Sequence, residues 1–377
     1  MPAKMKRREF VIQLTQGLAF ASLPSSVLAL SSEQFSTELS SLYSKSVVID
    51  SLCGPFSSAG PDAMPSQAAV EAVARSGITA INFTVSARDY EGTVRNLAFV
   101  QAIVDRWPET FVIVRKYSGI AQAKRDARLG IMPGFQYTSF LEEDPSRIET
   151  FRQLGVRIMQ LTYNNRGLFG DGCLEPGNAG LSKAGLDAVR RMNEIGVAVD
   201  TSHSGYRTTT DAIENSKKPV LITHAGCAAV YAHPRNKPDD ILKALADRGG
   251  YFGVYLMPYL VASPSIPTRE HLMGHLLHAL NTCGSDHVGI GSDGSIEEVK
   301  LTAEQKKAFD EDIARRKKLG IGAPGEDRYP YVPDLNGPDH LEVIANELSK
   351  RGQPSSVIEK VLGANFQRVL GEIWGQK

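Results

Sequence analysis

One pattern recurs three times in this sequence, in VAVDTSHSG (Val197–Gly205), PVLITHAG (Pro219–Gly226) and HVGIGSD (His287–Asp293). In each segment a short run of apolar, mostly β-branched residues is followed at once by His203, His224 or Asp293. Apolar runs of this length, bounded by Gly or Pro, are typical of fully buried strands. The pattern therefore places three polar side chains just beyond the last apolar positions of three strands.

These three side chains would meet in a parallel α/β barrel, because the βα loops converge at the carboxyl ends of its strands. Two imidazoles and one carboxylate suit zinc or a similar divalent ion. His203, His224 and Asp293 are therefore predicted to be metal ligands, with Asp293 as either the third ligand or a catalytic base. The alternative is that each residue only caps its own strand, and the shared position of all three favours the site.

Eight segments read as barrel strands that alternate with helical segments. They are Ser46–Asp50, Ile78–Val85, Gly130–Pro133, Val156–Thr162, Val197–Asp200, Val220–Thr223, Tyr251–Leu256 and Val288–Gly291. This alternation predicts an α/β fold, a single (β/α)8 barrel of TIM type, rather than a doubly wound sheet. Phe111–Val114 is expected to be a short extra strand, and the charged run Glu304–Lys318 a solvated helix.

Composition and charge narrow the class of protein. The chain has 42% hydrophobic and 22% charged residues, as expected of a soluble globular protein with a substantial core. Its 42 basic and 42 acidic residues balance, and we find no basic patch interleaved with aromatics, so nucleic acid is not an expected partner. The four cysteines form no CxxC pair; they could make up to two disulfides, whose pairing the sequence does not give.

The N-terminus is typical of a targeting segment. Arg7 and Arg8 precede Glu9-Phe10-Val11 and a moderately apolar stretch, as in a twin-arginine signal, so residues 1–31 are expected to be cleaved. Gln13 and Gln16 interrupt the apolar stretch, which makes it a poor membrane span. The mature protein is predicted to be periplasmic or otherwise exported, as a single barrel domain over residues 32–377 that ends in terminal helices.

Three further residues are candidates for binding substrate. Arg235 and Asn236 follow the sixth predicted strand, where an arginine can hold a substrate carboxylate through two parallel hydrogen bonds. Tyr163 ends the fourth strand, where its hydroxyl could donate a hydrogen bond to a developing oxyanion. Arg235 as an ordinary loop arginine and Tyr163 in a structural role remain the alternatives.

Five ordered segments carry a resemblance to a known family. They are LGVRIMQLTYN (Leu154–Asn164), MNEIGVAVDTSHSG (Met192–Gly205), HPRNKPDDILKALADRGG (His233–Gly250), HVGIGSD (His287–Asp293) and VLGANFQRVL (Val361–Leu370). The chain resembles the membrane (renal) dipeptidase family, the zinc peptidases of family M19, over roughly residues 45 to 370. The resemblance implies a zinc-dependent barrel that hydrolyses dipeptides. It also implies that His203 and His224 bind one zinc ion, that Asp293 lies beside the metal-bound water, and that Arg235 holds the substrate's terminal carboxylate.

The chain departs from this family where the family would bind a second zinc ion. Leu52 and Gly54 occupy the slots of the family's His-x-Asp motif, and Pro133 falls on the slot of its bridging glutamate. Tyr163 stands where the family has a histidine. Cys53 is a soft substitute ligand, but neighbouring residues of a strand point to opposite faces, which disfavours it. One zinc ion is therefore expected, with the second site lost.

The sequence thus predicts an exported, dipeptidase-like metallohydrolase that cleaves dipeptides or similar small amides with a metal-activated water. Asp293 and Tyr163 are the expected catalytic residues. One alternative is a degenerate barrel that binds a peptide-like small molecule without turnover, and another is a hydrolase or lyase acting on a different small substrate. No stable membrane span is expected in the mature chain. The sequence leaves open whether the chain forms a homodimer.

Overall fold

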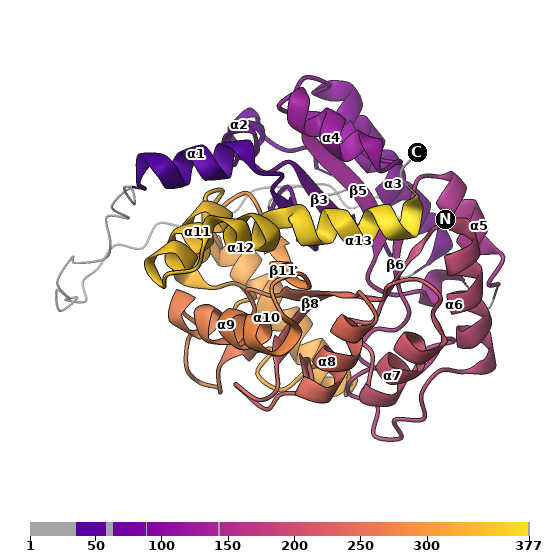
Figure 1. Ribbon diagram of the computed structural model, residues 1–377. Helices are drawn as coiled ribbons and strands as arrows, with labels where there is room; N and C mark the ends of the chain where they lie inside the picture. The colour runs from indigo at the N-terminus through magenta and orange to yellow at the C-terminus, as the bar shows by residue number, and fades with distance from the viewer. Residues whose placement is uncertain (1–34, 58–62, 88, 142–143, 376–377) are drawn as a thin grey trace, which may run out of the picture. The chain divides into compact units, whose positions relative to one another are not determined.

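Eight parallel strands form the centre of the fold, as the sequence predicts (Figure 1). The computed structural model describes residues 35–57, 63–87, 89–141 and 144–375. In barrel order the strands are β1 (Ile49–Asp50), β3 (Ala80–Thr84), β5 (Leu129–Phe135), β6 (Ile158–Gln160), β7 (Ala198–Asp200), β8 (Leu221–Cys227), β10 (Tyr251–Val254) and β11 (Val288–Ile290). The expected leader lies outside the described residues, and the chain from Phe35 onward forms one compact unit.

The barrel is nearly closed. Its first and last strands meet where the backbone N–H of Ser51 donates to the carbonyl oxygen of Ile290, at 2.9 Å. Four short strands lie outside the main path: β4 (Phe111–Ile113) pairs with β5, β9 (Asn236–Lys237) pairs with β8, and β2 (Cys53–Gly54) pairs with β12 (Gly294–Ser295). The extra strand predicted at Phe111–Val114 is therefore present as β4.

Helices alternate with the strands and cover them (Figure 1). They are α1 (Thr37–Lys45), α2 (Gln67–Arg75), α3 (Tyr90–Arg106), α4 (Ser118–Arg125), α5 (Arg147–Gln153), α6 (Lys183–Ile195), α7 (Tyr206–Asn215), α8 (Asp239–Asp247), α9 (Arg269–Cys283), α10 (Ala303–Lys318), α11 (His340–Lys350), α12 (Ser355–Glu359) and α13 (Asn365–Trp374). Short 3-10 turns lie at Ser139–Leu141, Pro258–Leu260 and Pro333–Leu335, and a π-turn at Lys360–Ala364.

Local signals set the helix ends. The Ser182 hydroxyl accepts from the Gly185 N–H at 3.0 Å and begins α6, and Gly196 ends it with φ of +69°, a conformation that glycine adopts without strain. Apolar faces of the helices then pack against the outside of the barrel, where the main core lies.

The terminal helix α13 closes the amino end of the barrel. Its residues Phe366, Val369 and Leu370 form one buried cluster with residues at or near the starts of the strands, such as Ala198 and Tyr251. Figure 1 shows α13, in yellow, lying across this end. The opposite end, where the strands finish, is left for a functional site.

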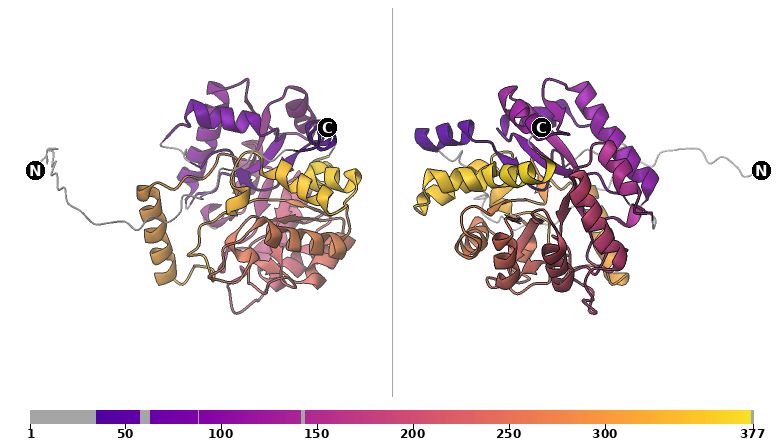
Figure 2. Two further views of the ribbon diagram at one scale, coloured as in Figure 1. Left: turned by 90° about the vertical axis from the view of Figure 1, so that its left-hand side faces the viewer. Right: turned by 45° about the vertical axis from the view of Figure 1, so that its right-hand side comes forward.

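Helix α10 stands apart from the other helices (Figure 2, left). A capping box of Thr302 and Gln305 begins it, and none of its residues is buried, as expected for a solvated helix. None of the helices in the described part of the chain combines the length and apolar character that a membrane crossing requires.

Candidate metal and substrate site

The structure brings together the three side chains that the recurring pattern singles out. His203 follows β7, His224 lies in β8, and Asp293 connects β11 to β12. One ligand atom from each lies within 4.8 Å of the other two. Ligand atoms around a tetrahedral zinc ion are roughly 3.3 Å apart, given bonds of about 2.0–2.1 Å, so a small inward movement would complete such a site.

His224 lies inside a strand rather than after one. The sequence predicts that the sixth strand ends at Thr223, but β8 continues to Cys227 because it pairs with β9 beyond His224. The register between β8 and β10 shifts at this point: Ile222 pairs with Phe252, but Ala225 pairs with Val254. The extra residue in β8 is a bulge, a device that re-aims a side chain next to a site.

Hydrogen bonds at Nδ1 determine the tautomer of both histidines and leave Nε2 unprotonated in the cluster. Nδ1 of His203 lies 2.7 Å from the acceptor Oδ1 of Asn164, so it carries the proton. The Thr223 hydroxyl donates to the Asp200 carboxylate at 2.6 Å, so at 2.9 Å it accepts from Nδ1 of His224. Both Nε2 atoms therefore carry lone pairs, as metal-binding imidazoles require.

The buried surroundings favour neutral imidazoles. His203 is 4% exposed and His224 is fully buried. Burial, and then the positive charge of Arg235, hold the pKa of each histidine well below its usual value. Nε2 of His203 is buried and has no hydrogen-bond partner among the described residues. An unpartnered lone pair facing a carboxylate and a second imidazole fits a divalent cation.

Asp293 sits in a left-handed backbone conformation, with φ of +56°. Its N–H donates to the Leu52 carbonyl at 2.8 Å, which fixes the turn between β11 and β12. Removal from bulk water raises the pKa of its carboxyl to about 6, although Arg235 opposes the shift. A carboxyl with such a pKa can either ligate a metal ion or take up a proton near neutral pH.

Gln136 is a member of the site that the sequence did not reveal. Its Nε2 lies 3.0 Å from Oδ1 of Asp293 and 3.5 Å from Nε2 of His224. The sequence comparison placed the family's bridging glutamate on Pro133, but Pro133 lies within β5. Gln136 is the first residue after β5 and Asp293 is the third after β11, so both lie at the carboxyl end of a barrel strand. That shared location was the signal that could have identified Gln136.

Arg235 is 1% exposed and lies against the histidines. Its Nη1 donates to the Ser202 carbonyl at 2.5 Å and its Nη2 to the His224 carbonyl at 3.3 Å. Its Nε is buried without a partner among the described residues. Arg235 therefore ties the two histidine segments together and keeps one N–H for a ligand.

The Asn236 side chain makes its hydrogen bonds to other groups of the protein. Asn236 makes hydrogen bonds to the carbonyls of Tyr231 and Tyr259 and accepts one from the Tyr255 hydroxyl, so these contacts hold the loop that carries Arg235. Its expected role in binding substrate stays a prediction.

The Tyr163 ring stacks on His203, with centroids 4.2 Å apart. Burial, and then the charge of Asp293, raise the pKa of Tyr163 to about 12, which keeps its hydroxyl a donor.

A cavity of about 240 Å³ joins these groups, lined by Tyr163, His203, Arg235 and Asp293 among others. Its outer wall comes from α10 and the segment after it, through Asp312, Arg316, Glu326 and Arg328. These four residues could not be assigned to the site from the sequence, because the pattern of an exposed charged helix does not indicate what the helix covers.

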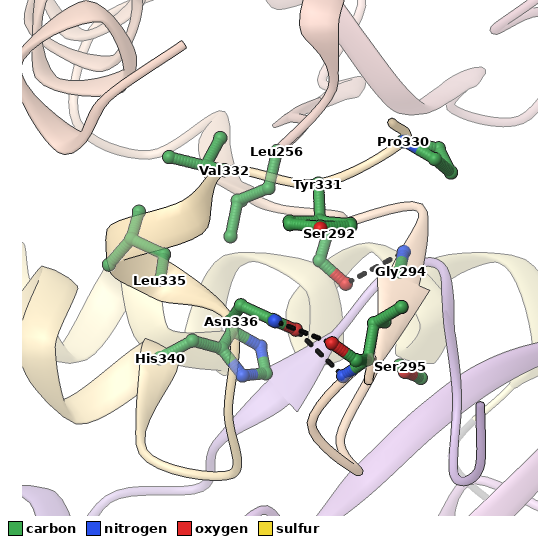
Figure 3. A pocket seen from close by; sticks show the side chains of 11 residues that line it. Leu256, Ser292, Gly294, Ser295, Pro330, Tyr331, Val332, Leu335, Asn336 and His340 are labelled. Atoms are coloured by element: carbon green, nitrogen blue, oxygen red, sulfur yellow. Dashed lines mark hydrogen bonds between the residues drawn. The ribbon is translucent and has the colours of Figure 1, made fainter. Parts of the chain in front are cut away.

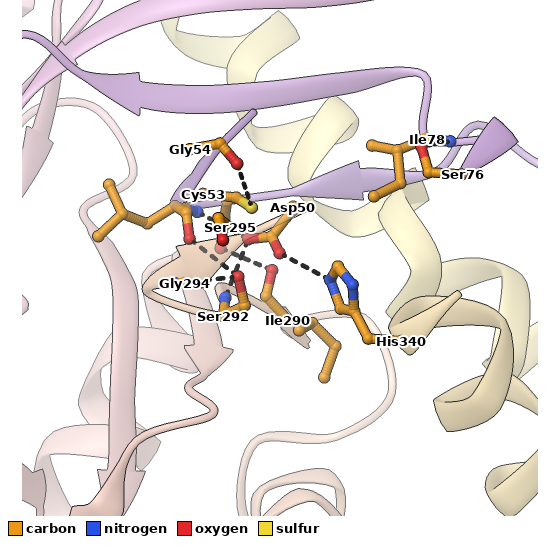
Figure 4. A network of polar contacts seen from close by, with 12 residues as sticks. Asp50, Cys53, Gly54, Ser76, Ile78, Ile290, Ser292, Gly294, Ser295 and His340 are labelled. Carbon is orange, nitrogen blue, oxygen red and sulfur yellow. Dashed lines mark hydrogen bonds and ion pairs between the residues drawn. The ribbon is translucent and has the colours of Figure 1, made fainter. Parts of the chain in front are cut away.

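Strand β1 supports the site without supplying a ligand. Oδ1 of Asp50 accepts from the N–H groups of Leu52 and Ser292, at 3.1 and 2.9 Å, and Oδ2 lies 3.4 Å from Nε2 of His340 (Figure 4). Asp50 thereby joins the turn after β1 to the turn that carries Asp293.

Cys53 is buried, and its thiol donates to the Gly54 carbonyl. Within the described ranges it does not belong to the ligand cluster. All four cysteines are free thiols in the described part of the chain.

A small cavity lies beside the hydrogen bonds of Asp50. Its volume is about 20 Å³, with room for about one water, and Ser292, Ser295 and His340 are among the residues that line it (Figure 3).

Comparisons with known proteins agree with this geometry. The profile of the family described as membrane dipeptidase (peptidase family M19) matches residues 64–311. The dipeptidase verJ of Clonostachys rogersoniana is 29% identical over 304 residues, which cover 78% of this chain and 75% of that protein.

Solved structures give the same result. An amidohydrolase from Pseudomonas aeruginosa is 30% identical and superimposes with a TM-score of 0.79, over 89% of this chain and 99% of that one. The probable dipeptidase PvdM from the same organism shares the fold at 16% identity, with a TM-score of 0.72 over 90% and 98% of the two chains.

Proposed function

We propose, from the premise that this chain belongs to the membrane dipeptidase family (peptidase family M19), that it hydrolyses the amide bond of dipeptides or similar small amides with one bound zinc ion. The observation that carries the proposal is the cluster of His203, His224 and Asp293, in which both imidazoles offer an unprotonated Nε2. Two histidines and a carboxylate, with a fourth position open, are a common ligand set of mononuclear zinc hydrolases.

His203, His224 and Asp293 would hold the ion, which when bound would acidify a water and polarise the scissile carbonyl. Arg235 would bind the terminal carboxylate of the substrate through its unpartnered Nε, and so place the amide bond over the cluster. Tyr163, held against His203 and protonated at neutral pH, would donate to the oxyanion that develops at the carbonyl. Asp293, if not fully engaged as a ligand, would receive the proton of the attacking water.

The location of the protein is part of the same proposal. Arg7 and Arg8 before the apolar stretch support twin-arginine export to the periplasm. That route exports folded proteins and suits a chain that acquires its metal before export.

One observation favours a second candidate, a barrel that binds a peptide-like ligand without cleaving it. The Gln136 amide donates a hydrogen bond to the Asp293 carboxylate and lies near Nε2 of His224, so it pairs with two groups that would otherwise bind a cation. Elemental analysis of the purified protein, together with a dipeptide-library hydrolysis assay, separates the two functions. Hydrolysis that is lost with a chelator and restored by zinc supports the enzyme. A protein that takes up no metal on reconstitution, and cleaves no dipeptide, is the binding barrel.

A further inference from the structure

A second and larger cavity, of about 460 Å³, adjoins the one that contains the ligand cluster. The two cavities share Gln136, Tyr163 and Arg316. A substrate held at Arg235 and at the cluster can therefore extend past Tyr163 into the second cavity.

The lining of this second cavity is cationic. It contains Arg166, Arg315 and Arg316, and none of the described residues that line it is Asp or Glu. The carboxylates that pair with these arginines lie elsewhere: Asp171 with Arg166 at 2.7 Å, Asp312 with Arg315 at 2.6 Å, and Glu326 with Arg316.

Arg316 lies at the junction of the two cavities. Its side chain is only 15% exposed, and its guanidinium carbon is 5.9 Å from the centre of the Tyr163 ring. Its Nε is buried and has no hydrogen-bond partner among the described residues. A buried N–H of a charged group without a partner is costly, and a ligand oxygen would remove that cost.

We propose that the 460 Å³ cavity receives an anionic side chain of the substrate, and that Arg316 is the residue that selects it. A guanidinium fork matches a carboxylate in shape as well as charge. The preferred substrates are then dipeptides with two carboxylates, the terminal one held by Arg235 and the side-chain one by Arg316. This inference rests on the proposed function, since it names the substrate class of the same site.

The test compares dipeptides that contain Glu with the same dipeptides containing Gln, at each of the two positions. The kcat/KM ratio of the Glu to the Gln substrate isolates the charge, because the two side chains have nearly the same size. For one of the two positions, we expect a ratio of at least about 10 in the unaltered protein, and a fall towards 1 in Arg316→Gln. Arg315→Gln should lower the ratio less, because the Arg315 side chain is 39% exposed and that of Arg316 only 15%.

Arg190→Gln is the matched control. Arg190 is an exposed arginine of α6, paired with Asp187 and Glu194, and it lines neither cavity. Arg190→Gln should therefore leave the kcat/KM ratio of the Glu to the Gln substrate unchanged. Arg316→Gln also loses the ion pair with Glu326, so its Tm is measured beside that of the unaltered protein to show that the variant is folded.

A binding measurement separates failure of this inference from failure of the proposed function. Phosphinate dipeptide mimics with a Glu or a Gln side chain resemble the tetrahedral transition state and are not cleaved. Calorimetry should give the Glu mimic a Kd at least about tenfold lower, and Arg316→Gln should abolish that difference. A protein that shows this binding preference but cleaves no dipeptide refutes the hydrolase and keeps the anionic cavity. Equal Kd values for the two mimics, or an unchanged ratio in Arg316→Gln, overturn the role of Arg316.

Discussion

The side-chain amide of Gln136 lies 3.0 Å from the carboxylate of Asp293 and 3.5 Å from Nε2 of His224. A neutral donor thus faces two groups that a cation would otherwise bind. Gln136 must turn, or present its oxygen, when an ion enters. Its replacement should therefore alter the metal affinity more than the fold.

Gln136→Glu should bind zinc about 10–100-fold more tightly than the unaltered protein, because a carboxylate replaces an amide beside the ligands. Without metal the same variant should have a lower Tm, because two carboxylates then face each other across the Gln136–Asp293 contact. Chelator competition gives the affinity, and thermal melts with and without zinc give the stability. Gln136→Ala is the control, since it removes the amide without adding charge. A zinc affinity that does not change in Gln136→Glu would place Gln136 outside the metal's reach.

The chain should bind at most one tightly held metal ion, because Leu52 and Gly54 offer no side-chain ligands after β1, and Gln136 after β5 is a neutral amide rather than a carboxylate. His203→Ala and His224→Ala should each lose the ion and any activity, while circular dichroism stays that of the folded barrel. Elemental analysis after dialysis measures the stoichiometry. Two equivalents per chain would contradict this model and require ligands beyond His203, His224 and Asp293.

Arg235→Ala should weaken turnover of dipeptides with a free C-terminus by about 2–5 kcal/mol, as expected for a desolvated charge pair. Arg235 also bonds the carbonyls of Ser202 and His224, so the variant loosens the histidine segments as well. Measuring a dipeptide and its C-terminal amide in the same variant cancels that second effect. Equal losses of kcat/KM for both substrates would remove carboxylate binding from Arg235.

The barrel could be predicted from the sequence because its strands are short, fully buried apolar runs. The predicted strand Val197–Asp200 is one residue longer than β7, and the predicted strand Val288–Gly291 is one residue longer than β11. The end of β8 could not be predicted, because pairing with β9 across a loop extends the strand through His224.

The site was only partly predictable from the sequence. His203, His224 and Asp293 each follow a recognisable apolar run, and that pattern depends only on local sequence. Gln136 was missed because the family's glutamate was placed on Pro133, three residues earlier. Arg316 and its helix contact the site only through tertiary structure, and a helix with no buried residue has no apolar face to reveal its neighbour.

Replacing Arg7 and Arg8 by lysine should leave the protein in the cytoplasm as uncleaved precursor, because the paired arginines are what the proposed export signal requires. Cell fractionation, with the precursor and mature forms separated by mass, measures this. The same double replacement at Arg190 and Arg191, on the exposed face of α6, should not affect export. Undiminished periplasmic protein in the Arg7/Arg8 variant would refute the twin-arginine signal.

Asp293 should make the metal-free protein less stable as the pH rises. Its pKa in the folded chain is about 6, above the ordinary 3.8, so the folded state holds this proton more tightly than the unfolded state does. That contribution is complete below pH 3.8 and is lost as the pH rises through about 6.

Asp293→Asn cannot ionise, so without metal it should exceed the unaltered protein in unfolding free energy by about 1–2 kcal/mol at pH 8, after allowance for partial solvent exposure. The difference should shrink towards zero near pH 4. His203 and His224 titrate in both proteins, so their effect cancels in the comparison. Urea unfolding between pH 4 and 8, with a chelator present, gives the difference. Saturating zinc should reverse the order, because Asp293→Asn lacks the anionic ligand. A difference that does not depend on pH would mean that the Asp293 carboxyl titrates alike in the folded and unfolded chains.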